Sequence, residues 1–443
     1  MTLEESLPSI AELEKYFDRL WPICRSLTGA GFRDSMRILK ELMPLEESEI
    51  PSGTQVFDWT VPDEWNIEDA FVENEVGVKV IDFKNSNLHV LNYSEPIDQW
   101  MDLEVLDKYL HSLPDQPNAI PYLTTYYKRR WGFCLTHEQR QRLKPGKYRA
   151  VIRSTLAPGV LTYGHAVLPA TVKTADEVLL STYLCHPSMA NNELSGPLVM
   201  SYVFKALQAL PERRYNYRFV VVPETIGAIA YLAKHGEWLK EHCKAGLVVT
   251  CCGDANRITY KRSRQGNAGI DRCVIDTLAG YKKSYGKSYE VEDFFPTGSD
   301  ERQYCSPGFN LPVGSLMRSR YGTYPEYHTS LDDKSFISFE ALQESVLLYL
   351  RALRAFECNE RLVTTVRCGE PMLGRRGLYP SLGSSKQTEE AVSRMMYLLN
   401  FCDGENDLCA VAEKAGCSIL DLASHASILK KEGLLVRQPG SSS

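Results

Sequence analysis

The chain has 443 residues, of which 44 % are hydrophobic, and a formal net charge of −6. This length allows two or three domains with buried cores, and the acidic balance leaves no overall basic surface for nucleic acid or an anionic membrane. No segment approaches the roughly 20 apolar residues of a membrane helix, and the acidic start MTLEESLPSIAELEKYF lacks the layout of a signal peptide. We therefore expect a cytoplasmic protein with neither a membrane nor a nucleic acid as partner.

The residue pattern in the first part of the chain changes at about residue 50. Residues 8–43 carry apolar side chains at helical spacing, which predicts a helical entry segment. The following hundred or so residues contain short runs such as VGVKVIDF, NLHVLNY and KYRAVIR, broken by Pro and Gly, and such runs are typical of strands. We predict that residues 49–159 form an inserted β-rich subdomain.

Residues 177–360 alternate apolar strands with helices. Strands such as EVLLSTYL and YRFVVVP are followed by helical segments such as GPLVMSYVFKALQAL and TIGAIAYLAKH. This alternation is typical of βαβ units, in which helices cover both faces of a largely parallel sheet. The fold class is therefore α/β, and the predicted catalytic domain is discontinuous, formed by residues 1–48 and 160–362.

The C-terminal region, residues 386–438, is predicted to be a winged helix-turn-helix domain. It contains three short amphipathic segments, EEAVSRMMYLLNF, DLCAVAEKAG and SILDLASHASILKKEG, followed by LLVRQPG. The presumed recognition helix has only Lys430 and Lys431 as basic residues, whereas DNA readers place Arg, Lys, Asn or Gln on the face toward the groove. A packing or dimerisation module is the favoured interpretation over DNA binding, and a homo-oligomer is one expectation.

Candidate catalytic residues lie where predicted strands end. His186 follows STYLC, Glu224 follows RFVVVP, and Asp254 follows LVVTCCG. Ligands bind at the carboxyl ends of strands in such sheets, so these side chains are expected at one edge. A hydrolytic zinc needs about three ligands, an open position for water and a carboxylate that accepts the water proton. His186 and His328, in the loop EYHTSLDD, are the candidate ligands, and Glu224 is the candidate base. Asn192, in the loop after His186, is expected at the same edge.

Four segments, CHPSMANNELSG, PETIG, GSDERQYCSPG and YHTSLDD, resemble the metal-site segments of M28-type zinc aminopeptidases. Nearly the whole chain is similar to an aminopeptidase-like subfamily with an inserted β domain and a C-terminal winged helix, including CRSLTGAGFRDS, PSGTQVFDWTVPDEW and YYKRRWGFC. The resemblance implies a zinc-aminopeptidase-like core. It also implies that His186 is the first metal ligand, His328 the last, and Glu224 the general base.

The chain departs from the family's metal-site pattern at three positions. Asn192 stands where the family has its bridging Asp, Thr225 replaces the second Glu, and Ser188 replaces the Asp after the first His. A ligand that bridges two cations must carry negative charge to offset their repulsion, and an amide is neutral. We expect one zinc per chain rather than two, with Asn192 as a weak ligand or hydrogen-bond partner. Asp254 and Asp300 are the candidates for its carboxylate ligand, and the strand-end position slightly favours Asp254.

The remaining candidates would bind the substrate. Asp300 or Glu301 would pair with a free α-amino group of a substrate. Arg129 and Arg130, in the aromatic segment YYKRRWGF, would recognise an acidic group, although an edge strand with a solvated basic face is an equal alternative. Tyr327, which precedes the last candidate ligand, completes the set.

The predicted function is that of a zinc-dependent aminopeptidase or amidohydrolase that cleaves an amide bond in a small peptide or aminoacyl conjugate. The same scaffold could serve another reaction on an aminoacyl or sugar-linked metabolite. The alternative of another class is a non-hydrolytic, ligand-binding protein with a degenerate metal site that signals through its winged helix. Retention of Glu224 favours catalysis, whereas loss of the bridging Asp and the second Glu favours the alternative.

Overall fold

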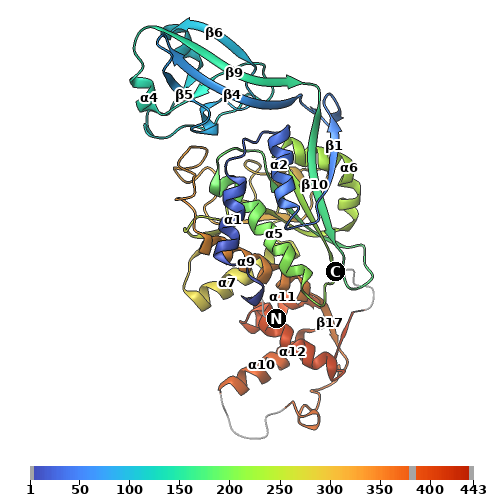
Figure 1. Ribbon diagram of the computed structural model, residues 1–443. Helices are drawn as coiled ribbons and strands as arrows, with labels where there is room; N and C mark the ends of the chain where they lie inside the picture. The colour runs from blue at the N-terminus through green and yellow to red at the C-terminus, as the bar shows by residue number, and fades with distance from the viewer. Residues whose placement is uncertain (1–3, 379–385, 439–443) are drawn as a thin grey trace.

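The computed structural model describes residues 4–378 and 386–438. Three units follow one another along the length of the molecule (Figure 1). The β-rich insertion lies at one end, an α/β domain in the middle, and a small C-terminal domain at the other end. Within the described residues, none of the helices has the length and apolar character that crossing a membrane would require.

The middle domain is built on an eight-stranded mixed sheet. Its four central strands, in the order β12-β11-β13-β16, are parallel, while β10 and β14 pair antiparallel at either side of them. All seven residues of β11 are buried, as expected for a strand covered on both faces. The predicted α/β fold with a parallel sheet centre is confirmed, with antiparallel strands added toward its edges. In sheet order the strands are β1 (Glu46–Pro51), β10 (Val160–Leu168), β12 (Asn216–Val222), β11 (Glu177–Tyr183), β13 (Cys243–Val249), β16 (Val313–Met317), β14 (Ile258–Lys261) and β15 (Tyr289–Glu292).

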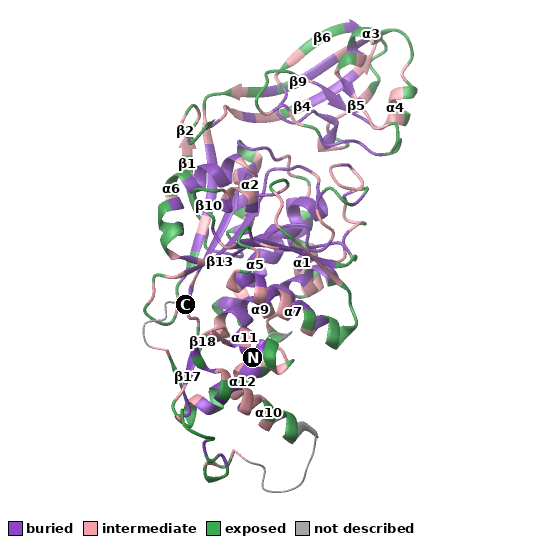
Figure 2. Ribbon diagram, turned by 180° about the vertical axis from the view of Figure 1, so that it is seen from behind, coloured by how far each residue is buried: buried purple, intermediate pink, exposed green. Residues whose placement is uncertain are grey.

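Helices cover both faces of this sheet, and each layer has its own apolar core. Figure 2 shows the strands and the helix faces against them buried. The helix α1 illustrates the local cause: Leu13, Phe17 and Leu20 recur at helical spacing and are fully buried, while Ser9 caps the first turn. One face carries α1 (Ile10–Leu20), α2 (Ala30–Leu39), α5 (Ser195–Gln208), α7 (Gly269–Tyr285) and α9 (Phe339–Cys358), and the other carries α6 (Ile226–His242) and α8 (Glu301–Tyr304).

The inserted subdomain leaves the sheet after β1 and returns as β10, its antiparallel neighbour. Its four-stranded antiparallel sheet, in the order β5-β4-β9-β6, buries a separate apolar core. From this subdomain a loop reaches back to the middle domain, where Pro121 forms a β-bridge with Thr329 and the Tyr122 N–H donates to the His328 carbonyl over 2.8 Å. The elements are β2 (Gln55–Val56), β3 (Trp59–Thr60), β4 (Glu64–Asn74), β5 (Lys79–Asp82), β6 (Ile97–Asp102), α3 (Leu103–Leu106), β7 (Leu110–His111), β8 (Phe133–Cys134), α4 (His137–Gln141) and β9 (Lys147–Ala157).

The C-terminal domain is a winged helix, as predicted. Its three-stranded sheet, in the order β18-β17-β19, includes β17, which begins soon after α9 ends. The amino end of α12 lies against α7, because the Asp276 carboxylate accepts the Ile419 N–H over 3.1 Å. DNA readers of this type contact bases with that end of the helix, so its docked position favours a packing role. The elements are β17 (Arg361–Thr364), α10 (Lys386–Phe401), β18 (Asp403–Asp407), α11 (Leu408–Ala415), α12 (Ile419–Lys431) and β19 (Leu435–Arg437).

The contact between α7 and α12 makes stability depend on pH. Burial raises the pKa of Asp276 to about 6. A carboxyl whose folded-state pKa is raised stabilises the fold below its unfolded pKa, near 4, and this contribution is lost as pH rises to about 6. We expect Asp276→Asn to remove ~2 kcal/mol of the pH dependence of unfolding between those values, measured by urea denaturation at each pH. The control is Asp293→Asn, whose side chain is 96 % exposed. An unchanged pH dependence in Asp276→Asn would contradict this assignment.

Candidate active site

Three predicted residues meet at the carboxyl edge of the central sheet. His186 lies beyond the end of β11, Glu224 beyond β12, and His328 in the loop before α9. The centroids of the two histidine rings are 5.2 Å apart, and the His186 Nε2 is 3.6 Å from the Glu224 Oε2. Two imidazoles that bind one zinc, with Zn–N bonds near 2 Å, have ring centroids roughly 5 Å apart. The ring separation therefore suits a shared ion.

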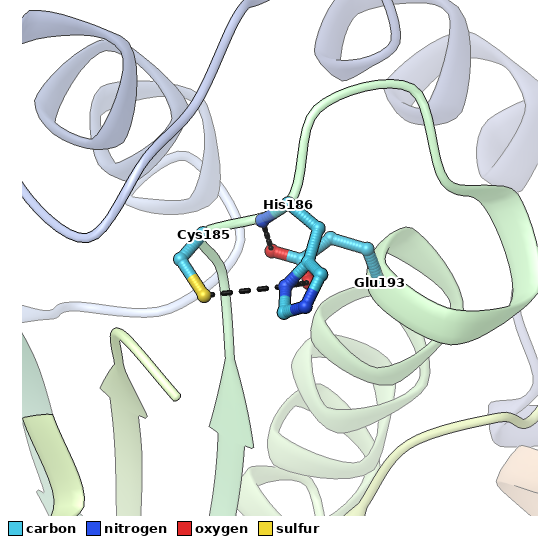
Figure 3. A group of neighbouring side chains, drawn as sticks. All are labelled: Cys185, His186 and Glu193. Carbon is cyan, nitrogen blue, oxygen red and sulfur yellow. Dashed lines mark hydrogen bonds and ion pairs between the residues drawn. The ribbon is translucent and has the colours of Figure 1, made fainter. Parts of the chain in front are cut away.

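Glu193 orients the His186 ring, as Figure 3 shows. Its Oε2 lies 2.9 Å from the His186 Nδ1, and its Oε1 accepts the His186 backbone N–H over 2.8 Å. Burial alone would lower the pKa of His186, but the charges of Glu193 and Glu224 outweigh burial and raise it. Glu193 contacts the ring at Nδ1, so Nε2 is the nitrogen that faces Glu224. Carboxylates of this kind fix the ring and tautomer of metal-binding histidines.

Cys185 contacts the same nitrogen of the His186 ring. Its Sγ is 3.2 Å from the His186 Nδ1, so Cys185, His186 and Glu193 form a compact group with metal-binding atom types (Figure 3). A metal there would have to replace the ion-pair contact between the His186 ring and Glu193. Burial also raises the pKa of the Cys185 thiol well above its usual range, which keeps it protonated. The Nε2 side of His186 is the better metal side.

A short π-helix, Ala190–Leu194, returns the loop after His186 to the site. The carboxylate of Asp332 holds it by accepting the backbone N–H groups of Asn191 and Asn192, over 2.6 and 2.9 Å. The Asn192 side chain donates to the Tyr183 hydroxyl over 2.9 Å. Single π-turns of this kind are frequent at functional sites, and this one places both Asn192 and Glu193.

Four buried polar atoms at the site have no hydrogen-bond partner within the described residues: His328 Nε2, Asp300 Oδ2, Asn192 Oδ1 and Glu193 Oε2, the last of which has only its ion-pair contact with His186. Burial and the charge of His186 lower the pKa of His328 to about 3, so its ring is neutral and keeps a lone pair. Burial, followed by the charge of Glu224, raises the pKa of Asp300 well above its usual range. Buried polar atoms are rarely left without a partner, and all four are metal-ligand types. Their chemistry suits a divalent cation, but within the described residues Cys185, His186 and Glu193 are the group that brings three such atoms within 4.8 Å of one another.

The other two acidic candidates are already satisfied. The Asp254 carboxylate accepts four hydrogen bonds of 2.9 to 3.0 Å, from the Asn191 side chain, the Asn256 N–H, and the N–H and hydroxyl of Ser319. These occupy the four lone-pair positions of a carboxylate. Glu301 forms a fully buried ion pair with Lys261 at 2.6 Å and accepts the Tyr321 hydroxyl over 2.7 Å. Neither carboxylate is free for a metal or a substrate amine.

The remaining candidates differ in position. Tyr327 stacks on the His328 ring, with centroids 4.0 Å apart. Arg129 is on the surface, with a side chain 59 % exposed, and pairs with Asp63 at 2.6 Å. Arg130 is also exposed. The structure therefore brings Tyr327 to the site but gives the two arginines no contact with its histidines.

The insertion supplies two tyrosines that the motifs did not indicate. The Tyr122 ring packs against both histidines, with its centroid 4.8 Å from that of His186 and 5.2 Å from that of His328. The Tyr122 and Tyr126 hydroxyls are hydrogen-bonded over 2.7 Å. Only the packing of the insertion over the sheet edge reveals them, although Tyr126 opens the aromatic segment YYKRRWGF, which carries the candidate substrate-binding residues Arg129 and Arg130.

Left-handed backbone conformations gather at the same edge. Ser188, Thr225, Cys251 and His328 have φ between 49° and 64°. Such conformations cost about 1–3 kcal/mol each for residues other than glycine and are retained mainly where function requires them.

Two known protein families match this chain. The family described as a domain of unknown function, DUF4910, matches residues 14–359, and a winged helix-turn-helix family matches residues 361–437. The chain belongs to the DUF4910 family. A relative of this DUF4910 chain in Clostridium acetobutylicum is named as a polysaccharide biosynthesis protein with an aminopeptidase-like domain. It is 44 % identical over 433 residues, which are 98 % of each protein.

Two solved structures are similar to the DUF4910 chain. A crystal structure described as a peptidase from Clostridium acetobutylicum has a TM-score of 0.91 and 42 % identity, covering 98 % of both chains. The zinc aminopeptidase BSAP from Bacillus subtilis has a TM-score of 0.56 and 11 % identity, covering 77 % of this chain and 94 % of that one. At that identity the second likeness shows the fold alone. The predicted zinc-aminopeptidase-like fold and the C-terminal winged helix are confirmed.

Asp254 and Asp300 of the DUF4910 chain should differ in their effect on stability. Asp254→Ala would leave several buried donors without an acceptor and lower the free energy of unfolding by about 3 kcal/mol. Asp300→Asn would remove a buried carboxyl with a raised pKa and keep the Thr225 contact, so the metal-free protein should be equally or more stable. Urea denaturation of both variants measures this difference. Equal losses in the two variants would show that Asp300 is a structural residue.

Proposed function

We propose that this chain is a zinc-dependent hydrolase that cleaves an amide bond in a small peptide or aminoacyl conjugate. One observation carries the proposal: the His186 Nε2 faces Glu224 at the sheet edge where the His328 Nε2 and the Asp300 Oδ2 are buried without partners among the described residues. A base beside a group of vacant metal-ligand atoms is the arrangement that metal-assisted hydrolysis requires.

Two histidines and one carboxylate would hold a single zinc. We assign His186, His328 and Asp300 as its ligands, in place of Asp254, whose carboxylate has no free lone pair. Asn192 adds a neutral oxygen, which supports one ion rather than two because a bridging ligand needs negative charge. When bound, zinc would polarise the scissile carbonyl and lower the pKa of an attacking water.

Residues of the chain itself would move the proton and position the groups. Glu224 would accept the proton of the attacking water at Oε2 and pass it to the leaving amine. Its backbone N–H donates to the Cys185 Sγ, and the next residue, Thr225, is hydrogen-bonded to Asp300, so the base and the assigned carboxylate ligand are held together. Tyr327 would form one wall through its stacking on His328.

The chemical class of the substrate follows from the site and the relatives. The base, the assigned ligands and Tyr122 are buried or half-buried, which suits a small substrate rather than a protein. The relative named for polysaccharide biosynthesis supports an aminoacyl or N-acyl group carried on a sugar as one class to test. Asp300 has only one free oxygen, so it would serve the ion and not a substrate amine.

Metal analysis with activity measurements tests the proposed function. We expect about one zinc per wild-type chain, lost in His186→Ala and His328→Ala, with release of amine from a panel of aminoacyl anilides and N-acyl amino sugars. Glu224→Gln should retain the zinc but lose roughly 100- to 10,000-fold in kcat, because it lacks the base. A wild-type protein that is folded, metal-free and inactive on the whole panel would instead support a ligand-binding protein.

Glu193→Gln tests the orientation of His186. Glu193 uses both of its carboxylate oxygens, one at the His186 ring and one at the His186 backbone N–H. The glutamine side chain has only one acceptor oxygen. We expect zinc affinity to fall about 10- to 100-fold, measured by competition with a chelator. The matched control, Glu237→Gln, changes a side chain that is 87 % exposed and should bind zinc as the wild type does. Unchanged affinity in Glu193→Gln would show that the carboxylate is not needed to orient the ring.

A further inference from the structure

The inserted subdomain is part of the wall of the active site. Its segment at residues 120–122 runs beside the loop that carries His328, held by the Pro121 bridge and by hydrogen bonds between the backbones. Tyr126, a few residues further on, packs against an apolar cluster that includes Cys185 and Ile226, the residues next to His186 and Thr225. The inserted subdomain thus places the Tyr126 ring against the apolar cluster that contains Cys185, with its hydroxyl hydrogen-bonded to Tyr122, whose ring packs against both histidines.

The two tyrosine hydroxyls carry two protons, of which their mutual hydrogen bond uses one. Tyr122 is 6 % exposed, and within the described residues its hydroxyl has no hydrogen-bond partner other than Tyr126. If Tyr126 donated, the Tyr122 proton would be buried without an acceptor, at a cost of about 1–3 kcal/mol. Tyr122 therefore donates to Tyr126. The half-buried Tyr126 keeps its own proton for a group in the opening.

The Tyr126 hydroxyl remains protonated at neutral pH. Burial, together with the charges of Cys185, Glu193 and Glu224, raises its pKa well above the usual range, despite the hydrogen bond from Tyr122, which lowers it. A neutral donor held beside a carboxylate base suits an oxygen that gains negative charge during reaction.

We propose that the Tyr126 hydroxyl donates a hydrogen bond to the carbonyl oxygen of the scissile amide as charge develops on it. This role rests on the proposed function. No covalent bond forms or breaks at Tyr126, whose proton stays on its own oxygen. The insertion is then a catalytic part of the enzyme, and Tyr122 is the positioning residue that directs the Tyr126 proton.

The test is Tyr126→Phe, which keeps the ring and removes only the hydroxyl. On the amide substrate hydrolysed fastest by the wild type, we expect kcat to fall of the order of 100-fold, with little change in KM or in zinc content. Tyr122→Phe keeps the donor and removes its neighbour, so its loss of kcat should be smaller. The control is Tyr127→Phe, whose ring is 54 % exposed and contacts Trp59, and it should behave as the wild type.

The outcomes separate this role from the proposed function. An active wild type with Tyr126→Phe equal to Tyr127→Phe would overturn the donor role and leave the hydrolase intact. A larger loss in Tyr122→Phe than in Tyr126→Phe would also overturn it, since Tyr122 would then be the donor. An inactive, metal-free wild type would overturn the hydrolase, and the donor role with it. Thermal unfolding of each variant shows whether a loss of kcat is a loss of fold.

Discussion

The ion-pair contact between the Glu193 carboxylate and the His186 ring is the contact on which the rest of the site depends. It holds the ring at Nδ1, so that Nε2 faces Glu224. It exists only because a π-turn brings Glu193 back to a histidine seven residues earlier, and because Asp332 holds that turn by two backbone N–H groups. The turn that leads into α5 therefore sets the orientation of the His186 ring.

Several features of the site lower the stability of the fold, and the rest of the domain offsets this loss. Three carboxyl groups, Glu193, Glu224 and Asp300, are gathered around His186, and four residues near them have left-handed backbone. Burial of like charges is unfavourable without a cation. The parallel centre of the sheet, buried under helices on both faces, is rigid enough to hold such an arrangement. A divalent ion would relieve the repulsion that the fold sustains.

The two additional units meet the middle domain at opposite ends (Figure 1). The insertion contributes Tyr122 and Tyr126 directly beside the two histidines. The winged helix instead packs on α7 and α9, with its recognition helix capped by Asp276. One added unit thus shapes the chemistry, whereas the other is held to the domain through the surface that a DNA reader would leave free.

The sequence by itself determined the α/β fold, the winged helix and the placement of His186 and Glu224. These follow from local patterns, because the carboxyl ends of parallel strands necessarily share one edge of a sheet. Asp254 obeys the same rule, yet its carboxylate is consumed by hydrogen bonds from the nearby Asn256 and from Asn191 and Ser319, which only tertiary packing brings to it. Likewise the Lys261 partner of Glu301 and the tyrosines of the insertion come from distant segments. Whether a polar group remains free depends on its neighbours in three dimensions. Strand order and residue type alone do not determine those neighbours.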